Sequence, residues 1–75
     1  DYHIYEFSEG KIMLVARSYK GDNEAHFLRK EIDGEKAFID QTDLESPLLS
    51  SAVEYLKNEG IETVSYLGQE GYVHL

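Results

Sequence analysis

The sequence predicts one α+β domain spanning residues 1–75, with a largely antiparallel sheet of five or six strands and one helix packed on one face. Three observations support this fold class. Only one segment, residues 46–61, has the apolar periodicity of a helix. The remaining apolar segments are rich in β-branched and aromatic residues. Most of them are separated by short turns that contain glycine, as in β-hairpins, so the expected order is ββββαββ.

Residues 2–7 and 11–19 are predicted to form the first hairpin around a three-residue loop, Ser8-Glu9-Gly10. In this register Ile4 lies opposite Leu14. Because directly paired residues share a face, one face carries Ile4, Ile12, Leu14 and Ala16. The other face carries Tyr5, Phe7, Met13 and Val15.

Residues 24–32 and 35–40 are predicted to form the second hairpin, because Asp33-Gly34 is a strong signal for a two-residue turn. The pairing starts with Ile32 opposite Glu35 and is expected to continue along both segments. The face toward the helix then carries Leu28, Ile32, Ala37 and Ile39. The opposite face carries Phe27, Arg29, Glu31, Lys36 and Phe38.

Local signals mark both ends of the predicted helix. Ser46 is a suitable N-cap, and Pro47 fits the first helical position. Gly60 fits the left-handed position after the helix, from which Ile61 packs back on Leu56. The apolar stripe of the helix consists of Leu48, Leu49, Ala52, Val53 and Leu56.

Two more strands, residues 61–67 and 72–75, are predicted after the helix, with Gly68-Gln69-Glu70-Gly71 as the turn between them.

In these registers one helix leaves a second, apolar face of the sheet uncovered. This face carries Tyr5, Phe7, Met13, Val15, Phe27 and Phe38. Three explanations are open on the sequence. The sheet curves strongly and encloses these side chains; the registers are off by one residue, which exchanges the faces; or a second molecule covers the patch.

The net charge of −8 lies mainly in the C-terminal half, where Lys57 is the only base after residue 39. Such a field repels nucleic acid and anionic lipid and attracts a basic protein, whose approach Asp43, Glu45 and Glu54 are expected to steer. The alternative is that the acids only keep a small domain soluble. No apolar segment approaches the length of a membrane span.

No motif for catalysis, a metal or a cofactor emerges. The chain has no cysteine, which excludes disulfides and thiolate chemistry and fits a reducing compartment such as the cytoplasm. His3, His26 and His74 lie far apart in sequence, so their spacing does not support a metal site. Asp40, Asp43 and Glu45 do not match a calcium-binding loop and are expected to be capping carboxylates.

The function expected from the sequence is a non-enzymatic protein-interaction module, either a homodimer or the partner of a basic protein. Its apolar anchors would be Tyr5, Phe7, Phe27 and Phe38. One alternative is an acidic inhibitor or immunity-type protein that occupies the basic site of a nucleic-acid-binding enzyme. Another is a small enzyme or ligand-binding domain, which requires a hollow that joins a histidine to carboxylates.

Overall fold

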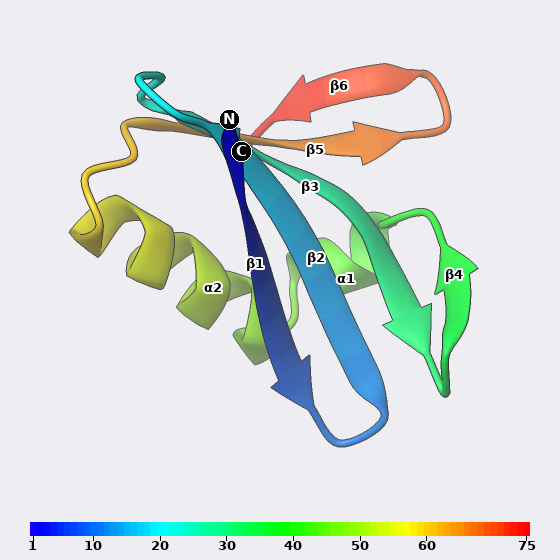
Figure 1. Ribbon diagram of the computed structural model, residues 1–75. Coiled ribbons are helices and arrows are strands. Elements are labelled where there is room, and N and C mark those ends of the chain that lie inside the picture. The colour runs from blue at the N-terminus through cyan, green and yellow to red at the C-terminus, as the bar shows by residue number, and fades with distance from the viewer.

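The computed structural model describes all 75 residues and contains six strands and two helices. The strands are β1 (Tyr2–Glu9), β2 (Ile12–Tyr19), β3 (Glu24–Ile32), β4 (Glu35–Ala37), β5 (Thr63–Gly68) and β6 (Gly71–His74), and the helices are α1 (Gln41–Leu44) and α2 (Pro47–Asn58). The strand order is β1-β2-β3-β5-β6, with β4 paired to the far end of β3 (Figure 1).

The predicted fold class is confirmed, with two additions. The sheet is mixed, because β5 runs parallel to β3 while all other neighbouring strands are antiparallel. A one-turn helix, α1, precedes the predicted helix. The sheet is not strongly curled, so strong curvature does not explain the second face (Figure 1).

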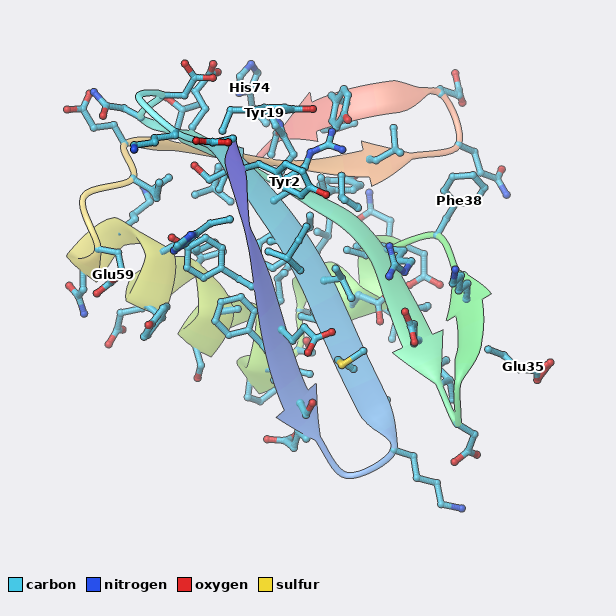
Figure 2. All side chains as sticks on the ribbon, in the orientation of Figure 1. Tyr2, Tyr19, Glu35, Phe38, Glu59 and His74 are labelled. Carbon is cyan, nitrogen blue, oxygen red and sulfur yellow. The ribbon has the colours of Figure 1, made fainter.

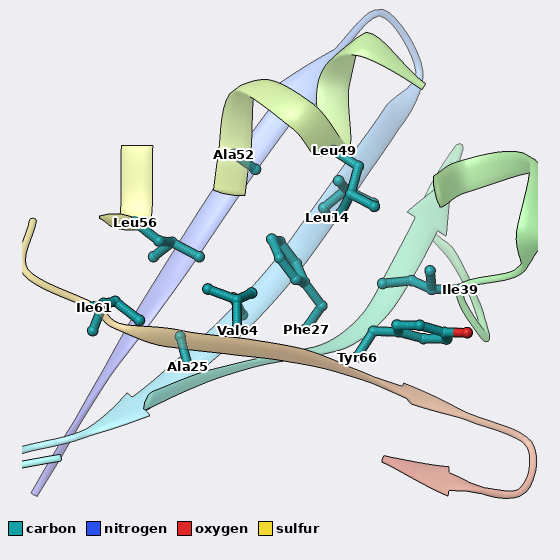
Figure 3. Close-up of a cluster of buried hydrophobic side chains, with 11 residues drawn as sticks. Leu14, Ala25, Phe27, Ile39, Leu49, Ala52, Leu56, Ile61, Val64 and Tyr66 are labelled. Carbon is teal, nitrogen blue, oxygen red and sulfur yellow. The ribbon is translucent and has the colours of Figure 1, made fainter. Parts of the chain in front are cut away.

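Both helices lie on the same face of the sheet, and the hydrophobic core fills the space between the two layers (Figures 1 and 3). Eleven buried residues form this core: Leu14, Ala16, Ala25, Phe27, Ile39, Leu49, Ala52, Leu56, Ile61, Val64 and Tyr66. We call the other side of the sheet, which no helix covers, the open face.

The ends of α2 are those that the sequence predicts. The Ser46 hydroxyl accepts a hydrogen bond from the Leu49 amide at 3.2 Å, and Pro47 is the first helical residue. Gly60 has a φ of 98°, which a residue with a side chain rarely adopts. The Ile61 amide then donates to the Leu56 carbonyl at 3.1 Å, which closes the helix and places Ile61 in the core.

The short helix α1 is held by reciprocal capping. The Asp40 carboxylate accepts from the amides of Thr42 and Asp43 at 3.0 and 3.2 Å, and the Asp43 carboxylate accepts from the Asp40 amide at 2.8 Å. Asp40 and Asp43 are therefore capping carboxylates, but they cap α1 and not the helix predicted at residues 46–61. β4 is shorter than the predicted strand 35–40. The chain leaves the sheet after Ala37, and Ile39 is buried in the core.

The predicted register of the first hairpin is wrong. The strands are joined by a two-residue turn, with Glu9 paired to Ile12, so that Tyr5 lies opposite Ala16 and Phe7 opposite Leu14. This shift turns Tyr5 and Phe7 toward the helix, where both pack against the core. Ile4, which we expected beneath the helix, belongs to the open face.

The second hairpin follows the prediction near its turn and departs from it further along. The pairs of Ile32, Glu31 and Lys30 with Glu35, Lys36 and Ala37 are confirmed, and Asp33 and Gly34 have φ values of 53° and 84°. Beyond Ala37 the predicted pairs do not form.

A β-bulge in β3 corrects the predicted position of Phe27. Val15 pairs with Arg29 and the next residue, Ala16, pairs with Phe27, so Leu28 is the extra residue between them. Phe27 therefore points into the core and is 0% exposed, whereas Leu28 is partly buried. The prediction that Leu28 lies beneath the helix and Phe27 faces away from it is wrong.

Candidate interaction surface

The open face is defined by strand pairing. Residues that pair with one another share a face, and core residues such as Leu14, Phe27 and Tyr66 fix the face that the helices cover. The side chains of the open face are Tyr2, Ile4, Glu6, Ser8, Met13, Val15, Arg17, Tyr19, Glu24, His26, Leu28, Arg29, Glu31, Lys36, Thr63, Ser65, Leu67, Tyr72 and His74.

Four large apolar or aromatic side chains of the open face are exposed to solvent. Tyr2 is 59% exposed, Ile4 47%, Tyr19 46% and Tyr72 53%. The rings of Tyr2 and Tyr19, on neighbouring strands, meet edge to face with centroids 6.0 Å apart (Figure 2). Such a cluster on a small domain is typical of an interaction site.

A polar row crosses the middle of the open face from β2 to β6. Arg17 pairs with His26, His26 with Ser65, and Ser65 with His74. His26 Nδ1 and the Ser65 hydroxyl share a short hydrogen bond, and the His26 ring lies 4.7 Å from the ring of Tyr72. The row is thus packed between aromatic rings.

Arg17 lacks a carboxylate partner. Its guanidinium carbon lies 4.9 Å from the centroid of the Tyr19 ring, a cation–π arrangement. Its Nε atom is buried and has no hydrogen-bond partner. The other arginine, Arg29, is paired with Glu31 at 2.8 Å.

The open face carries no net charge, although the chain is strongly acidic. Its charged side chains are three acids and three bases: Glu6, Glu24 and Glu31, and Arg17, Arg29 and Lys36. The excess of acids therefore lies elsewhere, and the helical layer carries much of it. Of the acids expected to steer a partner, Glu45 and Glu54 are exposed there.

Asp43 is the exception among these acids, because it is engaged within the fold. Its carboxylate binds the Lys30 ammonium at 2.7 Å, and Asp40 binds the same ammonium at 3.3 Å. The bond to Asp43 raises the pKa of Lys30, against the opposing effect of burial. The backbone amide of Asp43 and then the Lys30 ammonium lower the pKa of Asp40. This cluster ties β3 to α1.

The four predicted aromatic anchors occupy three different environments. Phe27 is fully buried in the core, and Tyr5 and Phe7 lie partly buried against it, each in edge-to-face contact with the ring of Tyr55 on α2. Only Phe38 is exposed, at 50%, just beyond β4 (Figure 2). The structure therefore does not bring the four together on one surface.

Three shallow hollows interrupt the surface. The first, about 470 Å³, lies at the start of β1 and contains His3 together with Asp1 and Asp22, but no hydrogen bond joins these side chains. The second, about 670 Å³, lies between the segment around Phe38 and the β5–β6 hairpin. The third, about 260 Å³, is lined by residues that include Leu28 and Phe38.

No group of three or more His, Asp or Glu side chains is placed to hold a metal ion. Neither helix has the length and apolar composition needed to cross a membrane.

Sequence reasoning missed Tyr2, Ile4 and Arg17 as residues of one surface. Alternation along β2 already places Arg17 and Tyr19 on the same face as Met13 and Val15. Alternation along β2 does not give the register of β1, and it is this register that places Ile4 beside Arg17. The observed register follows from a two-residue turn at Gly10-Lys11 in place of the predicted three-residue loop.

Comparison with protein-family models, with curated proteins and with solved structures finds no match to this chain.

Proposed function

We propose that this protein is a non-enzymatic interaction module that forms a homodimer through the open face of its sheet. The observation that carries the proposal is the exposed cluster of Tyr2, Ile4, Tyr19 and Tyr72 on a face with no net charge. Burial of these side chains against a second copy removes apolar surface from water.

Charge favours contact through this face over contact through the helical layer. Two copies of a chain with a net charge of −8 repel one another, but the balanced open faces can meet while the acids of the helical layer stay in solvent. The shortest dimension of the molecule is 23 Å, so those acids lie well beyond the Debye length of about 8 Å at physiological ionic strength.

The area of the open face determines how tightly the dimer is expected to bind. Five strands spaced about 4.8 Å apart, with the longer ones spanning about 26 Å, give a face of roughly 500 Å². A dimer would then bury about 1,000 Å² in total, below the 1,200–2,000 Å² of stable complexes. We therefore expect a reversible dimer with a dissociation constant in the micromolar range or weaker.

The experiment is sedimentation equilibrium over concentrations from micromolar to millimolar, in low and high salt, with two matched variants. Ile4→Asp places a charge on the open face. Val73→Asp makes the same kind of change at a residue that is 45% exposed but pairs with Tyr66 and so lies on the other face. We expect a wild-type dimer that persists in high salt, loss of the dimer in Ile4→Asp, and retention in Val73→Asp. Equal effects of both variants, or a monomeric wild type, would refute the proposal.

A second candidate function rests on the acidic helical layer. Glu45, Glu54, Glu59 and Glu62 are all exposed on or beside α2, where Lys57 is the only base. This favours a basic protein partner, such as the basic site of a nucleic-acid-binding enzyme. Binding of this kind should weaken steeply with salt and with Glu54→Lys, whereas binding through the open face should weaken only slightly with salt and should not respond to Glu54→Lys.

A further inference from the structure

The charged groups of the open face are incompletely paired within one copy. Arg17 has no carboxylate within 4.0 Å, in a chain with fifteen acids and seven bases. Glu6 and Glu24 of the same face are exposed and also lack an ion pair. One arginine and two glutamates are therefore free to bind groups of another molecule.

The position of Arg17 suits it to bind a carboxylate. Its planar guanidinium is held over the Tyr19 ring, which limits its freedom before binding. A guanidinium so held can form two parallel hydrogen bonds to one carboxylate.

We propose that Arg17 of each copy forms an ion pair with Glu6 or Glu24 of the other copy when the open faces meet. A dimer with two-fold symmetry makes every such contact twice, so a face that carries both an unpaired base and unpaired acids is complementary to itself. Two equivalent ion pairs then fix the orientation of the two sheets. This inference rests on the homodimer proposed above.

Charge reversal tests the ion pairs. Arg17→Glu should raise the dissociation constant of the dimer by about tenfold or more, because like charges then face one another. Glu6→Arg or Glu24→Arg should do the same, and the one that does identifies the partner of Arg17. Lys57→Glu is the matched control: it changes the net charge equally but lies on α2, so the dissociation constant should stay within about twofold.

Mixing the variants gives the decisive result. In an equal mixture of Arg17→Glu with the effective glutamate-to-arginine variant, both contacts of the mixed dimer again join a carboxylate to a guanidinium, and association should return. Thermal unfolding of each variant tests whether the chain is folded. Arg17→Gln is a milder second variant, which removes the charge without reversing it. A wild-type dimer that Arg17→Glu leaves unchanged, or a loss that neither mixture restores, would overturn the ion pair but not the homodimer. A wild type that is monomeric throughout would overturn both.

Discussion

The bulge in β3 leads to a sharp prediction, because it decides which of two adjacent residues stabilises the core. Phe27 is 0% exposed, lies across from Ala16 and Tyr66, and has its ring centroid 6.1 Å from that of Phe7. Truncation of so buried a phenylalanine to alanine costs about 3–5 kcal/mol. The whole domain of 75 residues is expected to have a free energy of unfolding of only about 4–11 kcal/mol.

Leu28 is partly buried on the open face, so only part of its side chain leaves water on folding. Leu28→Ala should therefore cost about 1 kcal/mol. Urea unfolding, followed by circular dichroism, measures both variants in the same way. A midpoint for Phe27→Ala that is much lower than that for Leu28→Ala, with similar slopes, is the expected result. The reverse order would show that β3 pairs without the bulge and that the faces are exchanged.

Three further predictions concern the second hairpin and the cluster that ties it to α1. Asp43→Ala should lower the free energy of unfolding by about 1–3 kcal/mol, because it leaves the Lys30 ammonium with only the longer bond to Asp40; a change near zero in urea unfolding would contradict this. Phe38→Ser should change stability by less than about 1 kcal/mol, because the side chain is 50% exposed; a loss as large as that of Phe27→Ala would place Phe38 in the core. The pKa of Asp40 is lowered from 3.8 by folding, so its contribution is present above pH 3.8 and is lost as the pH falls through the folded-state pKa. The free energy of unfolding of the wild type should therefore fall more steeply toward about pH 2 than that of Asp40→Asn, and equal slopes would be the contrary result.

The parts of the fold that the sequence predicts correctly depend on signals within a few residues. Ser46 and Pro47 start α2 by bonds and angles that involve only the first turn, and Gly60 ends it in the same local way. The turn at Asp33 and Gly34 likewise fixes the three pairs next to it. Such features do not require knowledge of the rest of the chain.

The errors arise where a choice depends on distant residues. Either a two- or a three-residue turn fits the segment around Gly10, and the sheet selects the one that places Tyr5 and Phe7 beneath α2. The bulge at Leu28 adds one residue to β3 without a local signal. The parallel pairing of β3 with β5 also joins segments that are far apart in sequence.

These errors account for the misplacement of the aromatic anchors. A register shift of an odd number of residues moves a whole strand's side chains to the other face. In β1 the shift places Tyr5 and Phe7 toward the helices and Ile4 on the open face. In β3 the bulge places Phe27 in the core and Leu28 on the open face. One face of the sheet is uncovered, but it also carries charged and polar side chains, and its exposed large apolar or aromatic residues are Tyr2, Ile4, Tyr19 and Tyr72 in place of the four expected.

The most direct test of the central proposal is to record methyl NMR spectra of the wild-type chain while its concentration rises from micromolar to millimolar. Ile4, Met13 and Leu67 report on the open face, and Ile12 and Val73 report on the other side of the same sheet. We predict that the methyl signals of the first group shift and broaden with concentration while those of the second group stay in place. Movement confined to the second group, or no movement in either, would contradict the proposal that the open face is the dimer interface.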